Sequence, residues 1–136
     1  MVKRISEDTK DVIHRALERS WSAKTSVCYN PKIAPLSYGQ CAPTAVVIAE
    51  MFGGEILKTQ VRKKDGTSVR HFYNRIEGQR YDFTRSQIDD LPDYFDALVY
   101  DDVVSSTAEA ITEMLPGQLD EMRSAFSKAL NAQNAG

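Results

Sequence analysis

The pattern of hydrophobic and polar positions places helices at the two ends of the chain and strands in its middle. Apolar residues recur at helical spacing from residue 6 to residue 21, with charged residues opposite them, and this predicts an amphipathic helix. Residues 22–40 are rich in Ser, Pro, Asn and Gly and predict a loop of a length that is often functional in small domains. Residues 41–52 are apolar on nearly every face, which predicts a buried, central helix.

The next segments have residue types that are typical of β-strands, separated by dipeptides that are typical of hairpin turns. Three runs are rich in β-branched and aromatic residues, namely residues 55–63, 69–76 and 80–84. The dipeptides Asp65-Gly66 and Glu77-Gly78 separate them and predict tight turns. An antiparallel meander of three strands follows from this pattern.

The rest of the chain returns to helical patterning. Residues 86–92 predict a short turn or helix off the sheet, and residues 107–114 and 117–132 predict helices separated at Pro116-Gly117. The complete order predicts an α+β fold: N-terminal helix, long loop, buried helix, three-stranded antiparallel sheet and C-terminal helices. The length of 136 residues suits one domain, 1–136, with a core over 6–92 and a helical extension over 95–132.

Composition narrows the classes of function. Hydrophobic residues make up 42% of the chain, charged residues 26%, and the formal net charge is -2, which gives no electrostatic footprint for nucleic acid or an anionic membrane surface. The N-terminus lacks the apolar segment of a secretion signal, and no apolar run is long enough to cross a bilayer. We therefore expect a cytoplasmic protein whose two cysteines, Cys28 and Cys41, are free thiols.

Cys41 is the strongest candidate for chemistry because it begins the predicted buried helix. Unpaired backbone N–H groups and the helix dipole favour a thiolate at such a position, and the same N–H groups can hold a developing oxyanion. The alternative interpretation is a small apolar side chain at a helix start, which is common for free cysteines.

A nucleophilic thiol needs a base, and the chain has two histidines. His14 lies among charged residues of the first predicted helix, whereas His71 lies in a predicted strand that can pack on the buried helix. If Ile76 pairs with Gln79, Asp82 is a diagonal neighbour of His71 and can orient its ring. A slip of one residue moves Asp82 to the other face and brings Asn74 opposite it, so that Asn74 is the second choice.

Several segments together resemble the YunG-like family of small bacterial proteins over roughly residues 14–90. They are Ser20-Trp21-Ser22, Thr25-Ser26, Gly39-Gln40-Cys41-Ala42, Phe52-Gly53-Gly54-Glu55-Ile56-Leu57-Lys58-Thr59, His71-Phe72-Tyr73-Asn74-Arg75 and Asp82-Phe83-Thr84-Arg85. More distantly, the order of a helix-borne Cys, a strand His and a polar residue on the next strand resembles papain-like cysteine peptidases and amidases. That resemblance implies a minimal papain-like core with Cys41 as nucleophile, His71 as general base and Asp82 as orienting group.

The same resemblance implies a hydrolase or acyl transferase acting on a peptide, amide or other acyl substrate, without a cofactor. One departure concerns the second oxyanion donor, because the papain pattern has a Gln several residues before the Cys, whereas Gln40 is adjacent to it. Gln40, Ser22, Asn74 and Trp21 are the candidates for this donor or for substrate contacts, although Trp21 also fits the core.

Two other hypotheses follow from the same residues. Cys28, Cys41, His71 and Asp82 contain ligand types that zinc accepts, but they lack the close pairs typical of zinc sites, so no metal is expected. A non-catalytic regulatory or interaction module is the second hypothesis. In it, apolar residues of the C-terminal helices dock a protein partner or a second copy of the chain.

Overall fold

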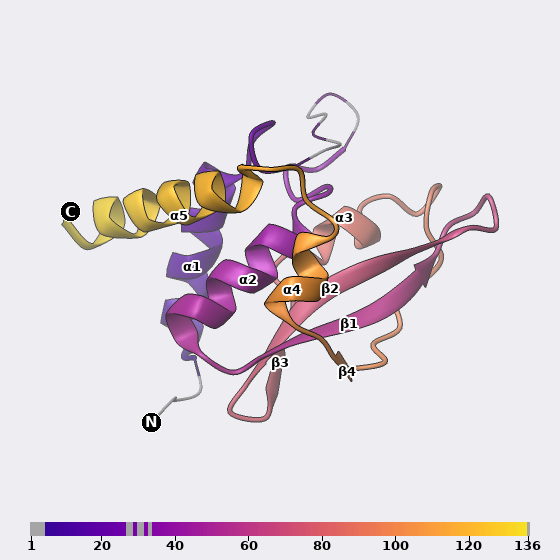
Figure 1. Cartoon of the computed structure of the whole chain (residues 1–136), viewed down its shortest axis with the longest axis horizontal. Coiled ribbons are helices and arrows are strands. Elements are labelled where there is room, and N and C mark those ends of the chain that lie inside the picture. Colours follow the sequence, from indigo (N-terminus) through magenta and orange to yellow (C-terminus); the bar gives the residue numbers. More distant parts are fainter. Residues whose placement is uncertain (1–4, 27–28, 30–31, 33, 136) are drawn as a thin grey trace.

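The computed structural model of the chain describes residues 5–26, 29, 32 and 34–135. Its helices and strands follow one another as α1 (Glu7–Ser20), α2 (Cys41–Phe52), β1 (Glu55–Arg62), β2 (Ser68–Ile76), β3 (Gln79–Tyr81), α3 (Ser86–Asp89), β4 (Val103–Val104), α4 (Thr107–Ile111) and α5 (Gln118–Ala135). Figure 1 shows α2 in the centre of the molecule, with α1 and α5 on one side and the sheet on the other. The fold is therefore α+β, as predicted.

The sheet has four strands, so the prediction of three strands was wrong. Their order is β3-β2-β1-β4, and all neighbours run antiparallel. The fourth strand is formed by only two residues, Val103 and Val104, which pair with Lys58 and Leu57 of β1. A two-residue strand leaves no periodic pattern in a sequence, and only its partner across the chain identifies it.

The register between β2 and β3 is the one that places Asp82 beside His71. Ile76 pairs with Gln79, and both turn residues between them have positive φ, Glu77 at 50° and Gly78 at 74°. Two positive φ values in a two-residue loop are the signature of a type I′ turn, whose twist matches that of the two strands. β3 ends at Tyr81, so the predicted strand over residues 80–84 is shorter than expected.

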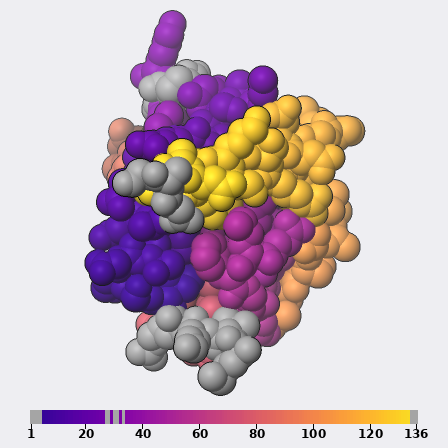
Figure 2. Space-filling model, turned by 90° about the vertical axis from the view of Figure 1, so that its left-hand side faces the viewer, coloured from indigo at the N-terminus to yellow at the C-terminus, as the bar shows by residue number. Residues whose placement is uncertain are grey.

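The core joins the two ends of the chain around α2. Helix α5 contributes Met122 and Phe126, both with no exposed surface, to a cluster that also contains Ile13 and Leu17 of α1. Figure 2 shows α5 in yellow lying across α1 and α2. On the other side of α2, Ala42 and Val46 pack with Phe72 of β2 in a second cluster. Helix α2 is thus buried between helices and sheet, which fixes the position of its first residue.

None of the helices in the described part of the chain is both long and apolar enough to span a bilayer.

Candidate functional site

Cys41 is held at the first turn of α2, against an open part of the sheet edge. The side chain is a free thiol and is only partly buried, whereas the residues that follow it in α2 are buried. β3 pairs with β2 only between Asn74 and Ile76, which leaves the edge of β2 free at Phe72. The backbone N–H of Phe72 donates to the Cys41 sulfur at this open edge. The residue is therefore partly exposed, and its sulfur meets a fixed hydrogen-bond donor.

His71 and Asp82 form a buried pair beside the thiol. The imidazole Nε2 and the carboxylate Oδ2 are 2.7 Å apart, and their side chains are 1% and 3% exposed. Asp82 follows the last residue of β3, so the hairpin register described above brings the carboxylate to the imidazole. Since Nε2 is used by Asp82, Nδ1 is the ring nitrogen left for the thiol.

The thiol and the imidazole shift each other's protonation. Burial raises the pKa of the Cys41 thiol, but the hydrogen bond and positive charge of His71, with smaller contributions from Phe72 and Gln87, lower it further than burial raises it. Burial lowers the pKa of His71, while hydrogen bonds to Asp82 and Cys41 and their negative charges raise it to about 10. Both shifts favour a thiolate beside an imidazolium at neutral pH.

Gln87 of α3 completes the site, and sequence reasoning missed it. Its Nε2 donates to Oγ1 of Thr84 at 3.2 Å and lies 3.1 Å from Nδ1 of His71, to which it can donate only while that nitrogen carries no proton. Its Oε1 accepts from the backbone N–H of Gly39 at 2.9 Å, which fixes the orientation of the amide. The segment 86–92 was predicted only as a turn or helix off the sheet, and no sequence signal links it to Cys41.

Tyr100 supports Asp82 from the far side. Its hydroxyl donates to the same carboxylate oxygen that His71 contacts, at 2.9 Å. Burial and the charge of Asp82 raise the pKa of Tyr100, so that the hydroxyl keeps its proton and remains a donor. The guanidinium of Arg80 lies over the Tyr100 ring, 4.3 Å from its centroid, and holds the ring in place.

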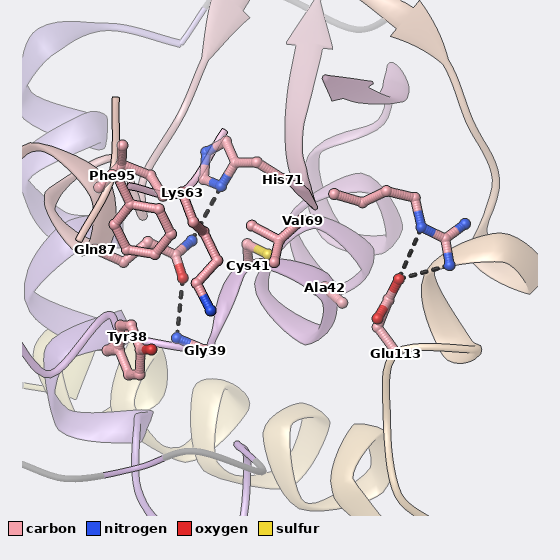
Figure 3. Close-up of a pocket in the computed structure, with 12 residues that line it drawn as sticks. Tyr38, Gly39, Cys41, Ala42, Lys63, Val69, His71, Gln87, Phe95 and Glu113 are labelled. Atoms are coloured by element: carbon pink, nitrogen blue, oxygen red, sulfur yellow. Dashed lines mark hydrogen bonds and ion pairs between the residues drawn. The ribbon is translucent and has the colours of Figure 1, made fainter. Parts of the chain in front are cut away.

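A pocket with a volume of about 230 Å³ opens onto the thiol. Figure 3 shows Cys41 near the centre of the lining residues, with His71 above it, Gln87 and Gly39 on the left and Glu113 on the right. The apolar wall of the pocket is formed by four residues, Ala42, Val69, Ile88 and Phe95. At this volume the pocket is smaller than the sites that hold drug-sized ligands, which span about 300–1,000 Å³.

The four candidates for an oxyanion donor or substrate contact make other contacts. Gln40 is buried, accepts from Oγ1 of Thr25 at 2.7 Å and donates to the Ser22 carbonyl at 3.2 Å. Asn74 donates to the carbonyl of Ala45 in α2 at 2.9 Å. The indole N–H of Trp21 donates to Thr44 at 2.9 Å. These bonds anchor the loop and the sheet to α2 and so position Cys41 indirectly.

The described part of the chain contains no cluster of side chains that could bind a metal ion. No three His, Cys, Asp or Glu side chains within those residues are placed to share one ion. Cys28, which belonged to the mixed set considered above, lies outside the described residues.

A family model and a known protein each match this chain over most of its length. The family model described as YunG protein matches residues 9–131. The chain is 38% identical over 117 residues to "Uncharacterized protein YunG" of Bacillus subtilis (strain 168), which covers 85% of this chain and 90% of that protein. No solved structure matches the chain.

Proposed function

This chain belongs to the YunG family, and we propose that it is a cysteine-dependent hydrolase or acyl transferase in which Cys41 is the nucleophile. The observation that carries the proposal is the series Cys41, His71 and Asp82, of which the first two line the pocket. A thiol with a lowered pKa meets an imidazole whose far nitrogen is held by a buried carboxylate. This is the arrangement that activates a thiol for attack on a carbonyl.

The reaction would proceed in two halves. The Cys41 thiolate attacks the carbonyl carbon, and the π electrons of the C=O bond move to its oxygen. As the bond to the leaving group breaks, the proton on Nδ1 of His71 passes to that group and a thioester remains on Cys41. Water or another nucleophile then gives a proton back to Nδ1, attacks the thioester and releases the thiolate.

The developing oxyanion needs donors, and the site offers two kinds. The N–H groups of Cys41 and Ala42 open α2 and have no acceptor within the helix. The amide of Gln87 lies within hydrogen-bond distance of Nδ1 and lowers the pKa of the thiol by its own hydrogen bond. We propose Gln87 as the second donor, a role for which Gln40 was one of four candidates from the sequence. The order of helix Cys, strand His and following Asp supports a minimal papain-like core.

The test is acylation by p-nitrophenyl acetate in a Cys28→Ser background, which leaves Cys41 as the only thiol. We expect a burst of one nitrophenolate per chain and an acetyl group on Cys41 by mass spectrometry. The Cys41→Ala chain should show no burst, and at pH 6.5 its free energy of unfolding should lie within about 1 kcal/mol of that of the parent chain. A burst rate equal to that of the same chain in denaturing urea would overturn the proposal.

A non-catalytic interaction module remains the second candidate. Five apolar side chains of the C-terminal region are strongly exposed, namely Val99, Val103, Val104, Ile111 and Leu115, with exposed fractions between 45% and 64%. Other apolar residues of that region, including Met122 and Phe126, fill the core and are not free to dock a partner. Light scattering of the full chain distinguishes a stable homodimer from a monomer.

A further inference from the structure

The charges around the candidate site are paired except at one position of the pocket wall. Arg70 lines the pocket, but its guanidinium bonds Glu113 at 2.8 Å and Glu109 at 3.2 Å. Glu109 is also paired with Lys58, at 2.6 Å. These four side chains contribute two positive and two negative charges, so they cancel at this side of the pocket.

Lys63 differs from Arg70 because its ammonium has no close partner among the described residues. Its nearest carboxylate is that of Asp65, at 3.9 Å, and the two side chains are 35% and 59% exposed. Asp65 is itself committed to the turn, because its Oδ1 accepts from the backbone N–H and the hydroxyl of Thr67 at 2.9 and 2.6 Å. An exposed pair at this distance is weak, so the charge of Lys63 is largely uncompensated.

The Lys63 side chain extends into the pocket. Figure 3 shows it beside Cys41 among the residues that line the pocket, with its nitrogen directed toward Gly39. Its backbone is fixed on both sides, because its N–H donates to Thr67 at 2.7 Å and the residue forms a β-bridge with Phe95. A cation on a fixed backbone, in the same pocket as an apolar wall and a nucleophile, can select an anionic group of a small ligand.

We propose that Lys63 determines the specificity of the pocket and that the substrate is a small acyl compound carrying a carboxylate. This inference rests on the proposed function, since it assigns the chemical class of the group that Cys41 would attack. The carbonyl would lie over the thiol, a short carbon skeleton would contact Ile88 and Phe95, and the carboxylate would pair with the Lys63 ammonium. The pocket, with a volume of about 230 Å³, has room for a short carbon skeleton between the thiol and the ammonium.

Alkylation of Cys41 by two reagents of matched size tests this charge selectivity. Iodoacetate and iodoacetamide both react by attack of the thiolate on the CH₂ carbon with loss of iodide, and they differ in carrying a carboxylate or a neutral amide. The measured quantity is the ratio of the two rate constants, in which changes of thiol reactivity cancel. The experiment uses the full chain in the Cys28→Ser background at low salt.

We expect Lys63→Gln to lower the iodoacetate-to-iodoacetamide ratio by about fivefold, as one charge a few ångströms away predicts in a hydrated site. Lys63→Arg should keep the ratio, because it keeps the charge. Lys64→Gln is the matched control, since Lys64 is the neighbouring lysine and pairs with Asp96 at 2.8 Å outside this pocket.

The outcomes separate this inference from the proposed function. An unchanged ratio in Lys63→Gln, or an equal fall in Lys64→Gln, overturns the role of Lys63 while leaving a fast-reacting thiol in place. If neither reagent modifies Cys41 faster than it modifies the unfolded chain, the proposed function fails and the substrate class falls with it.

Discussion

The two histidines of the chain each lie near a carboxylate, but in regions of opposite character. His14 lies on α1, where its Nε2 is 3.9 Å from Glu18 and the two side chains are 42% and 57% exposed. His71 lies between α2 and the sheet, 2.7 Å from Asp82, with side chains 1% and 3% exposed. The pairs contain the same chemical groups and differ mainly in burial and in what else they touch.

This difference determines what each imidazole can do. Water screens the His14–Glu18 pair, and pairs of this kind contribute little to stability. His71 is removed from water, and its ring nitrogens meet Asp82 on one side and Cys41 and Gln87 on the other. A change in the charge of His71 therefore affects the groups that contact it, whereas water screens a change in the charge of His14. The following predictions test that contrast.

The largest effect is expected on stability when the buried carboxylate is neutralised. Asp82→Asn should lower the free energy of unfolding by about 3 kcal/mol, near the lower end for a broken buried pair because His71 can release its proton. Glu18→Gln, the matched change beside His14, should cost less than about 0.5 kcal/mol. Urea unfolding at pH 7 measures both. Equal losses in the two variants would show that burial does not distinguish the pairs.

The next effect concerns the reactivity of the thiol. His71→Ala removes the positive charge and hydrogen bond that lower the pKa of Cys41, so most of the thiolate present at pH 7 should be lost. The rate of alkylation by iodoacetamide should fall by about 100-fold, as expected when a thiol returns to an ordinary pKa.

His14→Ala is the control for this measurement and should leave the alkylation rate within a factor of two. A fall of similar size in both variants would mean that the general positive potential of the protein, and not the contact with His71, activates the thiol.

The smallest effect is on the pH dependence of stability. The pKa of Cys41 is lowered from 9.0 and that of His71 is raised from 6.5, so between these ordinary values folding favours a proton on His71, while the unfolded chain carries it on Cys41. The numbers of bound protons are equal, so these two groups make no net contribution to the slope in this range.

In Cys41→Ala the folded state keeps the proton on His71 that the unfolded state releases above pH 6.5. Asp82 still raises the pKa of His71 in this variant, so the resulting stabilisation is complete below pH 6.5 and is lost as the pH rises above it. Relative to the wild-type protein, the free energy of unfolding of the variant should fall by up to about 1.4 kcal/mol for each pH unit. Urea unfolding at pH 6.5, 7.5 and 8.5 measures the difference, and parallel curves would contradict the ion pair.

Part of this site follows from local sequence. The run Cys41 to Phe52 forms the predicted helix because it is apolar throughout and ends at Gly53. The Glu77-Gly78 turn sets the pairing of Ile76 with Gln79, and this pairing brings His71 and Asp82 together. Both results depend on residues close to one another in the chain, where periodicity and turn geometry are sufficient.

The remainder was decided by tertiary structure. β4, Gln87 and Tyr100 each acquire their place from partners far away in sequence: β4 from β1, Gln87 from Gly39 and His71, and Tyr100 from Asp82. Lys63 became distinctive only when folding paired Arg70 with Glu109 and Glu113 and left the lysine facing the pocket. The sequence by itself determined the thiol at the helix start and the hairpin beside it. Long-range packing decided which donors and charges surround them, because side chains distant in the chain meet only when the core forms.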